Sequence, residues 1–143
     1  MREAGLAVIG GFHSPLEKDC LDILLKGRQP VVICPGRGLE KMRLPRNWQG
    51  PLDDGRLLLI SPFEPGTHRV TEKLALARNR FVAALAEAVI VAHASAGSKI
   101  EQLGGEVVAW GKKVFAIKDE KNHNLISLGA RPLSPTDITP LLG

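Results

Sequence analysis

The amino-acid sequence predicts a three-layer α/β sandwich around a mostly parallel sheet of about five to six strands. Short apolar runs alternate with helical patterns along the whole chain. The apolar runs are continuous, which is typical of strands that are covered on both faces. The first third of the chain has the pattern strand, helix, strand, which is the parallel crossover unit.

The first elements follow from apolar runs and from residues that start and stop helices. Gly5–Ile9, Pro30–Cys34 and Arg56–Ile60 are the first three predicted strands. Ser14 stands before a proline, a pattern that starts helices, and Gly27 ends the helix that follows.

The later elements continue the alternation. Thr67 or Thr71 caps a long helix that ends near Glu87. The other predicted elements are a short helix at Trp48–Leu52, a strand at Ala88–Ala92, a helix at Lys99–Trp110, a strand at Lys113–Ile117, a short helix at Asn124–Gly129, and a tail that contains Arg131–Pro132 and Thr136–Leu142. No linker or repeat divides the sequence, so residues 1–143 are expected to form one domain.

The composition bounds the class of function. The net charge of +4 favours anionic partners, although an ordinary basic protein has the same balance. Aromatic residues make up only 4% and tyrosine is absent, which weakens any binding mode based on several stacked bases. The sequence shows no signal peptide and no apolar run near the length of a membrane span, so a cytoplasmic protein is expected.

The cysteines and histidines point to no metal site. Cys20 on a helix and Cys34 at a strand end are expected to be buried thiols, and the four histidines are scattered. No cofactor is expected.

Loops rich in small residues follow the predicted strands. In an open parallel sheet these loops share one edge, where ligands bind. Gly10 and Gly11 lead into the helix that starts after Ser14, and glycines let a backbone approach an anion closely. A tight structural turn explains the same residues equally well.

The loop after the fourth strand repeats this design. Ser95 and Ser98 offer hydroxyl groups, Gly97 offers close approach, and Lys99 offers charge for a phosphate at a helix start. A serine cap beside a solvated lysine is the alternative.

Two arginines flank Asn79 on the long helix. Arg78 and Arg80 are two positions apart, so they point in different directions and only one is expected to face a ligand directly. Asn79 is a poor helix former, so a local hydrogen bond is expected to retain it.

The run from the third strand to the last helix resembles the Rossmann-like domain of the DNA-processing protein A (Smf) family. It reads LLLISPFEPGT, ARNRFVAALAEAVIVAHASAGSK, GGEVVAWGKKVFAI and NHNLISLGARPL in order. The similarity covers residues 30–138. The resemblance implies single-stranded DNA binding, recombinase loading and dimerisation without catalysis. It assigns phosphate or DNA contacts to Arg78, Arg80, Gly97, Ser98 and Arg37.

The expected binding residues are therefore Gly10, Gly11, Ser14, Arg37, Arg78, Arg80, Ser95, Gly97, Ser98 and Lys99. The expected function is a non-enzymatic domain that binds a nucleotide or the phosphates of single-stranded DNA. One alternative is an enzyme similar to the lysine-decarboxylase-like phosphoribohydrolases, with Glu101 or Glu106 as the acid. Another alternative is an interaction domain that has lost its site.

Overall fold

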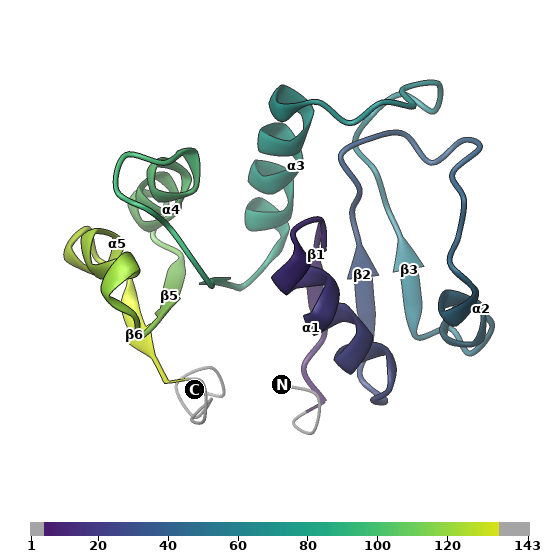
Figure 1. Ribbon diagram of the computed structural model, residues 1–143, viewed down its shortest axis with the longest axis horizontal. Coiled ribbons are helices and arrows are strands. Elements are labelled where there is room, and N and C mark those ends of the chain that lie inside the picture. The colour runs from purple at the N-terminus through teal and green to yellow at the C-terminus, as the bar shows by residue number, and fades with distance from the viewer. Residues whose placement is uncertain (1–4, 135–143) are drawn as a thin grey trace. The chain divides into compact units, whose positions relative to one another are not determined.

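Helices and strands alternate along residues 5–134, the part of the chain that the computed structural model describes (Figure 1). The strands are β1 (Val8–Gly10), β2 (Val31–Ile33), β3 (Leu57–Leu59), β4 (Ala88–Val91), β5 (Lys113–Ile117) and β6 (Arg131–Leu133). The helices are α1 (Pro15–Leu25), α2 (Arg46–Asp53), α3 (Glu72–Leu85), α4 (Lys99–Ala109) and α5 (His123–Ser127), with a short 3-10 turn at Glu120–Asn122. The predicted α/β class is confirmed.

The chain divides into two compact units, with the boundary after Val82 inside α3. The prediction of one domain over residues 1–143 stays a prediction. The predicted tail at Thr136–Leu142 lies outside the described residues. None of the described helices has the length and apolarity needed to cross a membrane.

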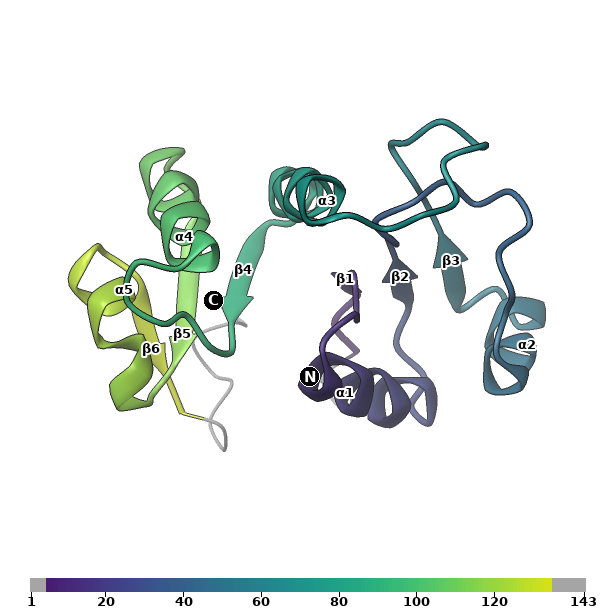
Figure 2. The same ribbon diagram turned by 45° about the horizontal axis from the view of Figure 1, so that its top comes forward.

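The first unit contains a three-stranded parallel sheet in the order β1-β2-β3. Figure 2 shows the arrows of β2 and β3 pointing the same way. Leu21, Leu24 and Leu25 of α1 pack with Val31 and Leu57 of the strands, and Trp48 and Leu52 of α2 cover the same cluster. The loops that follow these parallel strands therefore leave one edge of the sheet.

The second unit contains a second parallel sheet in the order β4-β5-β6. Leu103 and Val107 of α4 and Leu125 of α5 form its core together with the strands. α4 and α5 lie side by side in Figure 1, and a side chain at Gly104 would place its Cβ 2.6 Å from Leu125 Cδ1. Gly104 thus permits the close packing of the two helices.

Burial differs between the central strand of the second sheet, β5, and an edge strand of the first, β3. Val114, Phe115 and Ala116 of β5 are all buried, as expected for a strand covered on both faces. In β3, Leu57 is buried but Leu58 is 56% exposed. The expectation of two covered faces is wrong at β3, because Leu57 and Leu59 pack into the core cluster on one face whereas Leu58 points to the other face.

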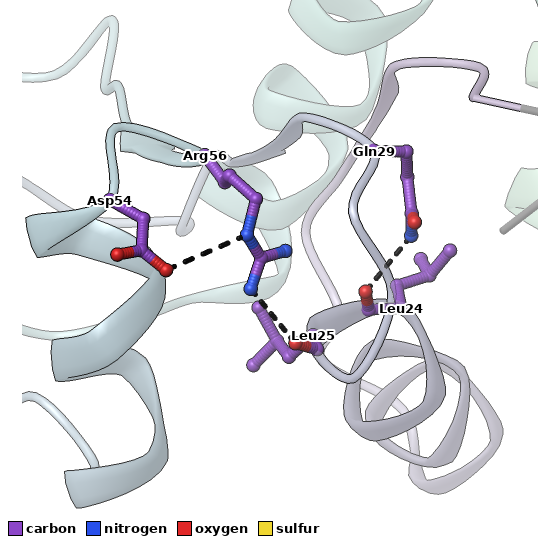
Figure 3. Close-up of polar contacts among 5 residues, drawn as sticks. All are labelled: Leu24, Leu25, Gln29, Asp54 and Arg56. Carbon is purple, nitrogen blue, oxygen red and sulfur yellow. Dashed lines mark hydrogen bonds and ion pairs between the residues drawn. The ribbon is translucent and has the colours of Figure 1, made fainter.

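Two polar side chains hold the C-terminal end of α1 (Figure 3). Gln29 Nε2 donates to Leu24 O at 2.9 Å, and Arg56 Nη2 donates to Leu25 O at 3.2 Å. Arg56 also lies 4.0 Å from the Asp54 carboxylate. A cation at this end of α1 is favourable, because the C-terminal end of the helix dipole is negative. These contacts therefore stabilise the end of α1 that lies away from the loop at its N-terminus.

The described residues change two further expectations and decide a third. Cys34 is buried as predicted, but Cys20 is exposed, because it lies on a face of α1 away from the buried leucines. Thr71 rather than Thr67 caps α3, since its Oγ1 accepts from Leu74 N at 3.2 Å. Arg131–Pro132 belongs to β6, at the edge of its sheet, where a proline is tolerated.

One lysine closes the C-terminal end of α3. Lys112 Nζ donates to Ala83 O, Ala84 O and Ala86 O at 2.9, 2.5 and 2.6 Å. These carbonyls have no partner within the helix ladder, so the ammonium group satisfies them and complements the dipole.

Replacing this lysine tests its contribution to stability. Lys112→Met should lower the free energy of unfolding by about 1.5–3 kcal/mol, because carbonyls lose a charged donor. Urea unfolding measures the loss, and Lys118→Met, at an exposed position after β5, is the control. Equal effects of the two variants would contradict the capping role.

Candidate functional site

The loop after β1 turns sharply toward the start of α1. Phe12 has a φ of 49° and is buried, with its ring beside Gly10. Gly10 O accepts from Cys34 N at 2.9 Å, which ties this loop to the end of β2. These contacts therefore hold the backbone of the loop in one conformation.

Arg78 lies beneath this loop and is only 4% exposed. Its Nη1 donates to Cys34 O at 3.1 Å, and its Nε donates to Asn79 Oδ1 at 2.8 Å. Burial lowers the pKa of the Arg78 guanidinium, and the Glu17 carboxylate opposes that shift. The expected local hydrogen bond of Asn79 is confirmed. Arg80, two residues further on, is exposed.

The guanidinium of Arg78 leaves no room for a side chain at Gly11. A Cβ there would overlap Arg78 Nη1 and Cζ and would lie 2.7 Å from Nε. Glycine is thus needed at position 11 for the close approach of Arg78, a reason that sequence reasoning about anions did not supply.

The turn after β2 is tied to the loop after β3. Arg37 donates to Gly38 O and Glu40 O at 2.9 and 2.8 Å, so its guanidinium stabilises its own turn. Ser61 Oγ donates to Arg37 O at 2.6 Å, and Gly38 N donates to Thr67 O at 2.7 Å. The expected meeting of these loops at one edge occurs within the first unit.

The start of α1 carries its own carboxylate cap. Ser14 Oγ accepts from Glu17 N at 3.3 Å, and Glu17 Oε2 accepts from Ser14 N at 3.0 Å. This is a capping box, which satisfies two amides at the helix start. Ser14 is therefore confirmed as a cap, and its predicted contact with phosphate stays a prediction.

In the second unit, Asn122 holds the ends of β4 and β5 together. It is fully buried, its Oδ1 accepts from Ala94 N at 2.8 Å, and its Nδ2 donates to Ala92 O at 3.0 Å and Ile117 O at 2.8 Å. Sequence reasoning missed this residue. Its signal is an amide side chain soon after an apolar strand, where free backbone groups need partners.

The loop after β4 places the other predicted residues around the start of α4. Gly97 has a φ of 74°, which favours glycine. Ser98 Oγ accepts from Glu101 N at 3.2 Å, and Glu101 Oε1 accepts from Gly97 N at 3.4 Å. Lys99 is exposed beside them. Glu101, a candidate acid of the alternative enzyme, thus caps the loop.

A shallow cavity of about 290 Å³ opens beside this loop. Ser95 Oγ and His93 Nε2 are hydrogen-bonded at 2.9 Å at its wall. The other lining residues are Ala96, Glu120, Lys121 and Asn124. No metal-binding cluster occurs among residues 5–134. Lys121 is a cation near the loop that sequence reasoning missed.

The predicted binding residues thus fall into two groups. Gly10, Gly11, Ser14 and Arg78 meet in the first unit, with Arg37 on the neighbouring turn and Arg80 exposed on α3. Ser95, Gly97, Ser98 and Lys99 meet in the second unit. Contact of either group with a phosphate stays a prediction.

Parallel strands joined by helices, with glycine- and serine-containing loops after the strands, define a Rossmann-like protein. The family model of DNA recombination-mediator protein A matches residues 1–142. The chain therefore belongs to the DNA recombination-mediator protein A family, as the resemblance in its sequence indicated.

Two solved structures share this fold. The DNA processing protein A of Streptococcus pneumoniae is 24% identical, with a TM-score of 0.72 over 90% of this chain and 48% of that protein. The DNA processing protein A of Helicobacter pylori is 18% identical, with a TM-score of 0.58 over 88% of this chain and 74% of that protein. The chain spans about half of the pneumococcal protein. No curated protein matches the chain.

Two neighbouring asparagines test the strand-end arrangement of the second unit. Asn122→Ala should lower the free energy of unfolding by at least about 1–3 kcal/mol, because buried backbone groups lose their partners. Asn124→Ala, at an exposed position, should change it by less than about 0.5 kcal/mol. Thermal and urea unfolding measure both variants. A similar small effect at the two positions would show that Asn122 does not hold the strands.

Proposed function

We propose that this chain binds single-stranded DNA through its phosphates and has a DNA-processing role without catalysis. The observation that carries the proposal is family membership over residues 1–142. The related structure from Helicobacter pylori is described as showing a single-stranded DNA binding mode. The mild positive charge of this chain is compatible with such a partner.

The proposed contacts are the loops that follow the strands. In the first unit they are the backbone of Gly10 and Gly11 with Ser14, the turn that holds Arg37, and the exposed Arg80. In the second unit they are Ser95, Gly97, Ser98 and Lys99. The basic side chains would supply charge, while the glycine backbones would permit close approach of a phosphate.

The scarcity of aromatic residues shapes the expected binding mode. With 4% aromatics, the chain offers few platforms for stacked bases, so phosphate contacts should dominate over contacts to bases. Binding should then depend steeply on salt and weakly on base sequence. A small nucleotide has the same phosphate chemistry and is the rival ligand.

Salt dependence measures the number of phosphate contacts. Fluorescence anisotropy with a labelled oligodeoxythymidine should show affinity falling steeply between roughly 50 and 200 mM salt. Lys99→Ala should reduce the slope of log K against log salt by about 0.7, the value for one lost contact to a single strand. Lys26→Ala, at the opposite end of α1, is the control and should leave the slope unchanged.

Competition separates the remaining candidates. Nucleoside monophosphates that displace the oligonucleotide at low concentration would favour a nucleotide-binding domain. Release of free base from them would favour the phosphoribohydrolase-like enzyme. Absence of both DNA and nucleotide binding would contradict the proposal.

The resemblance also implies a homodimer, and sedimentation velocity of the same samples tests this further proposal.

The two glutamate caps yield a separate prediction. Glu17 and Glu101 place carboxylates on amides at the two loops, where they repel an approaching phosphate. Glu101→Gln keeps an oxygen acceptor but removes the charge, so DNA affinity should rise about twofold to fivefold, or about 0.4–1 kcal/mol. Glu87→Gln, at an exposed position, is the matched control. An equal rise in both variants would indicate a net-charge effect instead.

A further inference from the structure

Arg78 is a charged side chain in a place where charge is costly. It is 4% exposed, and removing a guanidinium from water costs several kcal/mol unless hydrogen bonds compensate. Two such bonds reach Cys34 O and Asn79 Oδ1. A buried Arg78 has little surface left for a ligand.

The contacts of Arg78 connect two loops that follow neighbouring strands. Gly10 and Ile33 are paired in the ladder of β1 and β2, and Cys34 N continues that ladder by donating to Gly10 O. Arg78 then donates to Cys34 O and lies against Gly11. One side chain thus fixes where β2 ends and where the loop after β1 begins to turn.

The contacts of the Arg78 side chain indicate that it fixes the positions of neighbouring groups, beyond any contribution to the free energy of unfolding. A planar guanidinium presents its donors in a rigid fork, which a flexible lysine does not reproduce. Gly11 leaves space for the guanidinium, since any side chain at position 11 would overlap it. Arg80, by contrast, is exposed on the same helix.

We propose that Arg78 is a positioning residue that sets the course of the Gly10–Ser14 loop for phosphate binding and does not itself contact the phosphate. The proposal rests on the proposed function of DNA binding. It revises the expectation from sequence that Arg78 is a phosphate ligand, and it leaves Arg80 among the residues that contribute charge.

The number of released counterions distinguishes positioning from direct contact. Arg78→Gln should weaken oligodeoxythymidine binding by about tenfold, or about 1.4 kcal/mol, at every salt concentration. Its slope of log K against log salt should equal that of the wild type. Arg80→Gln, the matched control, should reduce the slope by about 0.7. Arg78→Lys should restore little of the affinity, because it restores charge without the fork.

Three outcomes of this experiment overturn the inference. A reduced slope for Arg78→Gln would show direct phosphate contact. Unchanged affinity for a folded Arg78→Gln would show a purely structural role. Full rescue by Arg78→Lys would show that charge alone matters. Wild-type protein that binds no DNA would instead refute the proposed function, and the positioning role with it.

A second measurement tests the contact between Gly11 and Arg78 without DNA, and it can be made even on variants with reduced stability. Gly11→Ala should destabilise the wild-type chain, because the methyl group displaces the guanidinium. In the Arg78→Ala background the same change should cost far less, so the two effects should couple strongly in a double-mutant cycle of unfolding. Additive effects would contradict the contact on which the inference depends.

Discussion

The ends of parallel strands pose a hydrogen-bonding problem that a buried side chain solves in each unit. Where a strand stops, its last backbone groups leave the ladder and need other partners. Arg78 satisfies Cys34 O in the first unit, and Asn122 satisfies groups at the ends of β4 and β5 in the second. The loops expected to bind phosphate begin at the strand ends that Arg78 and Asn122 bind, so the conformation of these loops depends on the two side chains.

The residues that bind the backbone of the loops differ from the residues that offer positive charge at the surface. Arg78 and Asn122 are buried and hold backbone, whereas Arg80, Lys99 and Lys121 are exposed. Charge at the surface is accessible to a flexible anion such as single-stranded DNA, and a rigid loop reduces the ordering that binding requires. The carboxylates of Glu17 and Glu101 each accept from an amide at the loop of their own unit, where their charge opposes a second anion.

The sequence predicted the elements well because their signals are local. Apolar runs marked β1 to β5, and cap residues such as Ser14 and Ser98 marked helix starts that the structure confirms. β6 was missed because three residues with a central proline carry no strand pattern. Exposure of Leu58 depends on which face of the first sheet other elements cover, which local patterns do not encode.

The candidate site was less predictable because its geometry depends on contacts between distant residues. The sequence identified Gly11 and Arg78 separately, but only the fold shows that one makes room for the other across α3 and the first loop. Asn122 was missed because its three partners come from the loop after β4 and from the end of β5. Helix spacing correctly predicted that Arg78 and Arg80 diverge, but not which of them is buried.

Backbone amide NMR during titration with oligodeoxythymidine tests most directly whether phosphate binds at these loops. The largest saturable changes in chemical shift should fall on residues 10–14 and 95–98. Amides of α2 and of the exposed side of β3 should stay unchanged. Changes confined to α2 and β3, or no saturable change at either loop, would contradict phosphate binding at these loops.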